Sequence, residues 1–249
     1  MSYKRTMLID SFILPCLASF LIKPLFGLKY LDNWPSIEST FIASGRMLSE
    51  HLPHPGWQPV WYCGTRTDYI YPPALLYGTA LASRFGPLLP VRAYHLYIAV
   101  FYVLGIAAIY WMVRIGSNSR AAGWLAAAAT ALLSPSFLLL TQVRHDSGRW
   151  IPQRLHALMV LGEGPHISAL CVLPAALTAT FMALRKWRPG ALAAAGALCA
   201  LVVANNFYGA TALAFCYPVM VWSVWVGERS GAVWVRAAFI PLARDFRAT

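Results

Sequence analysis

Charged residues are scarce in this chain, and acidic residues are the scarcest of all. Only 12% of the 249 residues are Asp, Glu, Lys or Arg, whereas soluble domains carry roughly 25%. Apolar residues make up 59% of the sequence, and several stretches are apolar on every face of a helix, which a soluble core does not accommodate. The composition therefore excludes an ordinary soluble domain and predicts that water is not the main solvent of this protein.

The sequence also lacks a C-x-x-C pair and a continuous basic stripe. Four of the five cysteines lie in apolar stretches, where thiols usually pack as small side chains, so no redox centre or cysteine zinc site is indicated. Lys and Arg outnumber Asp and Glu by 20 to 9, but they occur in short runs beside apolar stretches. This pattern favours orientation in an anionic membrane, and we expect no nucleic-acid partner.

Apolar stretches long enough to cross a bilayer recur along the chain. A transmembrane helix needs about 20 apolar residues, and about six stretches approach that length. The expected spans cover residues 7–26, 93–113, 121–141, 166–184, 190–207 and 210–226. Asp10 interrupts the first span near one end, and we expect its carboxylate to extend toward the interface. The predicted fold class is all-α, a polytopic transmembrane helix bundle that forms one domain over residues 1–249.

Two shorter helices are expected outside the spans. Residues 74–85 number about a dozen between proline-containing turns, too few to cross, and they suit a helix on the membrane surface. A second helix is expected over about residues 36–50. With 74–85 on the surface, the basic turns and the N-terminus lie in the cytoplasm. The outer loops then cover residues 27–92 and 142–165, in what we expect to be a bacterial cytoplasmic membrane.

Acidic side chains gather in the two predicted outer loops. Glu38 opens the expected helix of the first loop, where a carboxylate serves as a general base or simply complements the helix dipole. Asp146 follows the third span, and Glu163 stands beside His166 at the start of the fourth. If these groups converge at one membrane surface, they supply a general base or bind a divalent cation, with Glu163 as a metal ligand. The alternative is that G-E-G-P-H only caps the following helix.

Arginines fall on the same predicted side as the acidic residues. Guanidinium groups beside a membrane suit phosphate or pyrophosphate, which they bind through paired hydrogen bonds; contact with ordinary anionic lipid is the alternative. An asparagine ends the fifth span at the same face, where its amide contacts a polar substrate or caps the helix. The candidate substrate-binding residues are Arg46, Arg66, Arg144, Arg149, His166 and Asn205, with Arg154 nearby.

The order of these features resembles the front end of a GT-C type membrane glycosyltransferase. The matching pieces, between about residues 7 and 149, are I-E-S-T-F with Glu38, Y-P-P-A-L-L-Y, R-I-G-S-N-S-R, L-S-P-S-F-L-L-L and R-H-D-S with Asp146. Within that superfamily, W-P-S-I-E-S-T-F-I-A-S-G-R-M-L, P-H-P-G-W-Q-P-V-W-Y-C-G and G-E-G-P-H resemble a bacterial membrane family labelled 6-pyruvoyl-tetrahydropterin synthase-related. Nothing in the sequence supports a pterin site.

The resemblance implies transfer of a sugar from a polyprenyl-phosphate donor to an acceptor at the outer face. By analogy, Glu38 is the general base and Asp146 a supporting or metal-binding carboxylate. Ile37 replaces one acid of the family's pair, and such enzymes usually have more spans, so we expect a shortened member. Membrane lipid and the lipid-linked sugar are the implied partners, and a divalent metal ion is a candidate cofactor. The alternatives are a non-catalytic subunit or degenerate fragment of such an enzyme, and a small-molecule transporter.

Overall fold

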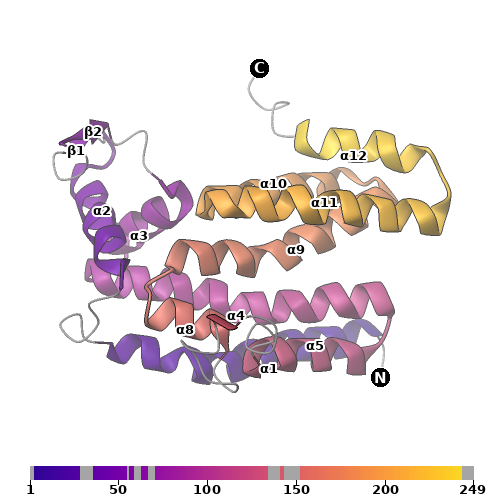
Figure 1. Ribbon diagram of the computed structural model, residues 1–249, viewed down its shortest axis with the longest axis horizontal. Helices are drawn as coiled ribbons and strands as arrows, with labels where there is room; N and C mark the ends of the chain where they lie inside the picture. Colours follow the sequence, from indigo (N-terminus) through magenta and orange to yellow (C-terminus); the bar gives the residue numbers. More distant parts are fainter. Residues whose placement is uncertain are drawn as a thin grey trace.

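The computed structural model is a bundle of α-helices with one short β-hairpin (Figure 1). It describes residues 3–28, 36–54, 56–58, 63–66, 71–133, 141–142 and 152–242. Within these residues the only strands are β1 (Trp57–Gln58) and β2 (Thr65–Arg66), which pair antiparallel. The predicted all-α class is therefore confirmed.

Four helices are long and apolar enough to cross a membrane. They are α1 (Tyr3–Ile22, extended by the 3-10 helix η1, Lys23–Gly27), α4 (Pro90–Ser117), α9 (Gly164–Lys186) and α11 (Phe207–Glu228). Each contains one of the stretches predicted to span, namely 7–26, 93–113, 166–184 and 210–226. These four helices indicate a membrane protein, in agreement with the composition.

The other two predicted spans are shorter in the described part of the chain. α10 (Pro189–Asn205) has 17 residues, which makes it about 26 Å long. α5 (Arg120–Leu132) has 13 residues, and residues 134–140 of the predicted span lie outside the described residues. A total of about six spans therefore stays a prediction.

The turns between the helices contain local stop and start signals. Asn118 ends α4 in the left-handed conformation, and the Ser119 hydroxyl caps α5 by accepting a hydrogen bond from the Ala122 amide at 3.2 Å. The Asn206 side chain caps α11 in the same way, accepting from the Tyr208 amide at 2.7 Å. Because these signals are local in sequence, each helix pair reverses direction within a few residues.

The helices lie side by side, so their ends form two groups (Figure 1). The first group, here called the basic end, contains the start of α1 and the turns that follow α4, α9 and α11. Its basic residues include Lys4, Arg5, Arg114, Arg120, Arg185, Lys186, Arg188 and Arg229. The second group, the loop end, contains α2 (Glu38–His51), α3 (Pro73–Phe85), the hairpin and the α10–α11 turn. The basic turns and the long first loop are thus at opposite ends; which end faces the cytoplasm stays a prediction.

Two short helices form the framework of the loop end. α2 and α3 pack on each other and on α4, and their bounds agree with the helices predicted at 36–50 and 74–85. Leu48 from α2 meets Leu76 and Ala80 from α3 in a small buried cluster. α3 has 13 residues and is not among the helices long enough to cross. It packs against the bundle on one face, and its contact with a membrane surface stays a prediction.

Three elements were not predicted from the sequence. The β1–β2 hairpin lies inside the first loop, and α8 (Gln153–Met159) occupies part of the predicted loop 142–165. α12 (Ala232–Leu242) follows α11 and packs on α9, α10 and α11. Strands of two residues and helices of 7 and 11 residues are too short for a clear periodic pattern.

A buried carboxylate joins three helices near the basic end. Asp10 of α1 is 0% exposed. Its oxygens accept hydrogen bonds from Arg120 Nε at 2.8 Å, from Arg120 Nη2 at 2.7 Å and from the Tyr110 hydroxyl at 2.5 Å. Whether Asp10 lies near the membrane interface stays a prediction, but its carboxylate is buried against partners within the protein. Its partners come from α4 and α5, so the carboxylate is satisfied inside the bundle.

Candidate functional site

Glu38 begins α2 at the point where the two predicted outer loops touch. The Ile37 amide donates a hydrogen bond to the Leu161 carbonyl at 3.0 Å, and the Glu38 amide donates to the Ser36 hydroxyl at 3.3 Å. Gly162 has a φ of +72°, and a Cβ there would lie 2.6 Å from the Glu38 nitrogen. The turn that leads into α9 is therefore pressed against the start of α2, and only glycine fits this contact.

The carboxylate of Glu38 faces a histidine from α4. Glu38 Oε2 and His95 Nε2 lie 3.3 Å apart, and each residue is only 2% exposed. His95 was not among the residues predicted from the sequence. The signal was nevertheless present, because an ionisable residue within a predicted membrane span usually marks a functional site.

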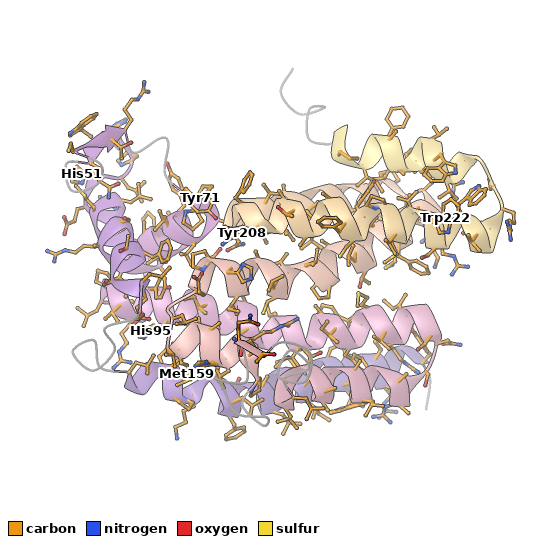
Figure 2. The ribbon with its side chains drawn as sticks, viewed as in Figure 1. His51, Tyr71, His95, Met159, Tyr208 and Trp222 are labelled. Carbon is orange, nitrogen blue, oxygen red and sulfur yellow. The ribbon has the colours of Figure 1, made fainter. Side chains whose placement is uncertain are left out.

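Aromatic rings enclose the Glu38–His95 pair. Phe26 meets the His95 imidazole edge-on with ring centroids 6.0 Å apart, and Tyr94 lies beside it. The Tyr94 hydroxyl donates to the Gly162 carbonyl at 3.3 Å, which ties α4 to the same turn. Figure 2 shows His95 near the loop end, where α2 approaches α4. The apolar surroundings strengthen any electrostatic interaction inside the pair.

One nitrogen of this histidine has no partner among the described residues. His95 Nδ1 is buried and accepts or donates no hydrogen bond within the part of the chain that the structure describes. Assigning the ring proton to Nε2 lets it donate to Glu38 and leaves a lone pair on Nδ1. With this tautomer, Glu38 accepts a hydrogen bond from His95 Nε2, and the lone pair on Nδ1 is available to accept a hydrogen bond from a third group.

His166 and Asn205 lie at the same end of the bundle but contact other partners. The half-buried His166 ring, in the first turn of α9, meets Tyr208 edge-on at 6.0 Å between centroids. Asn205 is fully buried; its Oδ1 accepts from the Tyr97 hydroxyl at 2.8 Å, and its Nδ2 donates to the Leu201 carbonyl at 2.9 Å. The amide of Asn205 therefore binds α4 to α10 within the protein.

The predicted phosphate-binding arginines that are described are exposed. Arg46 pairs with Glu50 one turn further along α2 at 2.8 Å, and this carboxylate raises the pKa of the guanidinium. Eight residues separate Arg46 from Glu38, about 12 Å along the helix. Arg66 lies on the exposed side of β2. Arg154 differs, because it lies beside the Cys171 thiol and near Tyr102, between α9 and α4.

Three candidate residues, Asp146, Arg144 and Arg149, lie outside the described residues. Glu163 is at the N-cap position of α9; its amide donates to Ala157 and its carbonyl accepts from Ile167. No group of three or more His, Cys, Asp or Glu side chains is close enough to hold a metal ion among the residues that the structure describes. The metal role of Glu163 accordingly stays a prediction.

No family model, curated protein or solved structure matches this chain. The resemblance to GT-C type glycosyltransferases therefore stays a prediction from the sequence motifs.

Proposed function

We propose that this protein is a glycosyltransferase-like membrane enzyme that transfers a sugar from a polyprenyl phosphate to an acceptor hydroxyl. The buried Glu38–His95 pair is the observation that supports this proposal most. It places a carboxylate and an imidazole 3.3 Å apart where the first loop meets the turn before α9. Carboxylate and imidazole groups are the usual general acids and bases of enzymes, and transfer of a sugar to a hydroxyl uses a general base.

The proposed reaction uses Glu38 as that base. The carboxylate takes the proton of the acceptor hydroxyl while its oxygen attacks the anomeric carbon of the sugar. The bond between that carbon and the phosphate oxygen breaks, and the polyprenyl phosphate leaves with the electron pair. His95 donates a hydrogen bond to Glu38 and so holds the carboxylate in position. Since Glu38 is 2% exposed, the acceptor enters only when the start of α2 moves away from the 161–164 turn.

The remaining candidates keep their proposed roles. Arg154 of α8 is half-buried beside the Cys171 thiol, and a cation in such a position suits an anionic substrate, so Arg154 is proposed as a phosphate-binding arginine as well. Asp146 is proposed as a supporting carboxylate and Glu163 as a metal ligand. The proposed topology has about six spans and a cytoplasmic N-terminus, so that the loop end faces outward.

Release of free prenyl phosphate tests the proposal without knowledge of the acceptor. Membranes that contain the protein are incubated with short prenyl phosphates linked to different hexoses and pentoses. Glu38→Gln is expected to slow release at least about 100-fold, the usual contribution of a general base. Glu228→Gln is the control, because Glu228 is an acid at the basic end that pairs with Arg185, away from every proposed substrate-binding residue. Lack of release above control membranes for every donor, or full activity of Glu38→Gln, would rule out the proposed mechanism.

A second candidate function is favoured by the burial of Glu38. A carboxylate enclosed at 2% exposure and paired with histidine is also what a structural link between α2 and α4 requires. A non-catalytic subunit of a membrane glycosyltransferase would use the pair in this way. In that case the wild type releases no prenyl phosphate, while Glu38→Gln still lowers its melting temperature.

A further inference from the structure

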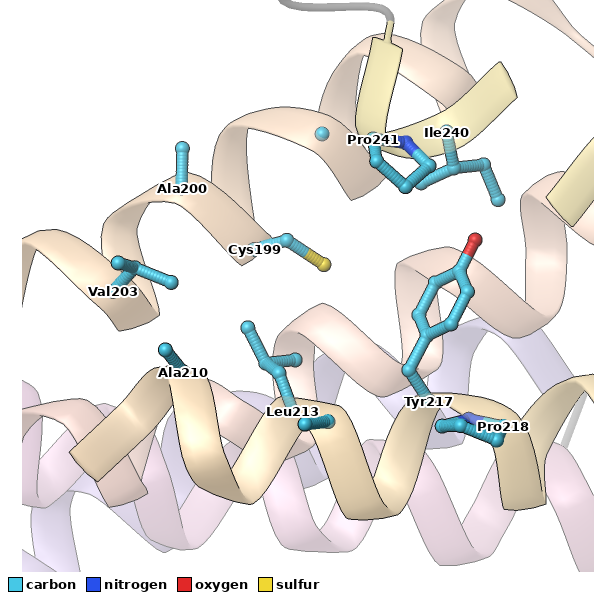
Figure 3. Close-up of a pocket in the computed structure, with 11 residues that line it drawn as sticks. Cys199, Ala200, Val203, Ala210, Leu213, Tyr217, Pro218, Ile240 and Pro241 are labelled. Carbon is cyan, nitrogen blue, oxygen red and sulfur yellow. The ribbon is translucent and has the colours of Figure 1, made fainter. Parts of the chain in front are cut away.

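A groove opens on the outside of the bundle between α10, α11 and α12, away from the Glu38–His95 pair. Its volume is about 370 Å³, and its lining is almost entirely apolar (Figure 3). The groove forms because the side chains of α10 that face it are mostly small and Pro218 of α11 is compact. The residues that line it include Gly196, Cys199, Ala200, Leu213, Tyr217 and Pro218.

The far wall of the groove is held in place by a hydrogen bond between two helices. The Tyr217 hydroxyl donates to the Ala237 carbonyl of α12 at 2.6 Å. Tyr217 and Ile240 also belong to a buried cluster that continues along α11 toward the basic end. The groove is therefore continuous with the packing beneath the α11–α12 turn.

Tryptophans and cations surround that turn at the basic end. Trp225 contacts Trp222 and Trp234, with ring centroids 5.0 and 6.1 Å away, and the Arg229 guanidinium lies 5.8 Å from the Trp225 ring. Figure 2 shows Trp222 at this end. Tryptophans with one exposed edge are typical of the level of lipid headgroups in a membrane.

The charge around these tryptophans is strongly positive. Lys186, Arg188 and Arg229 are exposed. Arg185 pairs with Glu228 at 3.2 Å, and Arg236 donates to the Leu184 carbonyl at 2.6 Å. Glu228 is the only acid among the described residues 183–242. The surface is therefore complementary to an anion.

The distance between the cations and the groove matches half a bilayer. Pro218 precedes Arg229 by 11 residues in the sequence, about 16 Å along a helix. The hydrocarbon layer of one leaflet is about 15 Å thick. The acyl chain of a lipid with its headgroup at Arg229 therefore reaches the end of the groove nearest the basic end. The other end, at Ala210, lies 19 residues before Arg229, about 28 Å along a helix.

We propose that the groove binds one acyl chain of an anionic phospholipid whose headgroup contacts Lys186, Arg188 and Arg229. The lipid belongs to the leaflet at the basic end, so it is distinct from the sugar donor proposed at the loop end. Apolar packing in the groove holds the chain, and the cations select the charged headgroup.

Retention of lipid by the purified full chain tests the charge selection. Native mass spectrometry compares phosphatidylglycerol with phosphatidylcholine of the same acyl chains. We expect the wild type to retain phosphatidylglycerol preferentially, and Lys186→Gln/Arg188→Gln to lower this preference about tenfold. Lys4→Gln/Lys23→Gln removes the same charge from exposed positions near the two ends of α1, a helix that does not line the groove, and should retain the preference. Equal retention of both lipids by the wild type, or an unchanged preference in Lys186→Gln/Arg188→Gln, would overturn the proposal.

The thiol of Cys199 reports directly on the groove that it lines. In a variant with the other four cysteines replaced by serine or alanine, N-ethylmaleimide should modify Cys199 several-fold more slowly when phosphatidylglycerol is present. Phosphatidylcholine at the same concentration should leave the rate unchanged. Ala200→Trp, which fills the groove, should abolish the protection while retaining a cooperative thermal transition. If phosphatidylglycerol does not slow the modification, no acyl chain occupies the groove.

Discussion

Arg120 holds the carboxylate of Asp10 through two hydrogen bonds at 2.7 and 2.8 Å, although 110 residues separate them in the sequence. The carboxylate is fully buried, whereas the guanidinium is about half exposed, at 49%. The Tyr110 hydroxyl completes the set of donors from α4. This contact joins α1 to α5 at the basic end.

We predict that Asp10→Asn lowers the melting temperature of the detergent-solubilised protein by several degrees. The amide removes the charge that Arg120 and Tyr110 surround, and it turns one acceptor into a donor that faces their N–H and O–H groups. Glu50→Gln is the control, since it breaks an ion pair that is exposed on both sides and should leave the melting temperature unchanged. A similar effect of both substitutions would argue against a structural role for Asp10.

Replacement of Gly162 by alanine should loosen the contact between α2 and the turn before α9. The added Cβ would lie 2.4 Å from the Ser36 hydroxyl at a φ of +72°, and such strain typically costs about 1–3 kcal/mol. Gly190→Ala is a matched control, because nothing lies within 4 Å of its Cβ position. Gly162→Ala should therefore lower the melting temperature, whereas Gly190→Ala should leave it unchanged or raise it. Equal stability would show that the 161–164 turn does not press on α2.

The Glu38–His95 pair should behave as one energetic unit. Glu38→Gln and His95→Gln are each expected to destabilise the protein, and the double variant should lose less than the sum of the two. The expected coupling energy is about 0.5–3 kcal/mol, the range found for residues in direct contact. A double-mutant cycle of unfolding free energies measures it. Strict additivity would mean that the two groups do not interact in the membrane.

Single cysteines should distinguish the two ends of the bundle. In a cysteine-free background, an impermeant thiol reagent added to intact cells is expected to label Ser39→Cys at the loop end. It should fail to label Ser117→Cys and Gly190→Cys, which stand at exposed positions of the basic end. Labelling at all three positions would contradict the proposed topology. Labelling of Ser117→Cys and Gly190→Cys but not Ser39→Cys would show that the topology is the reverse of the proposed one. The candidate site would then face the cytoplasm.

At the loop end, sequence patterns predicted the helices but not the contacts between them. The predicted stretches 36–50 and 74–85 correspond to α2 and α3, since proline turns and helix length are local properties. Glu38 was selected by its place at the start of such a helix. His95, 57 residues away, was missed because no spacing rule relates a loop residue to a residue in the second turn of a long apolar helix.

The sequence by itself determined the apolar character and the approximate positions of the long helices. A run of about 20 apolar residues has few stable alternatives to a membrane-spanning helix, and residues such as Ser119 and Asn206 cap neighbouring helices through contacts within three residues. Tertiary structure alone decided which polar groups meet. The pairs Asp10–Arg120 and Glu38–His95 form because helix packing brings distant residues together, and a buried charge is stable only where packing supplies its partner. The groove beside Tyr217 likewise depends on the gap between three helices, which no local pattern encodes.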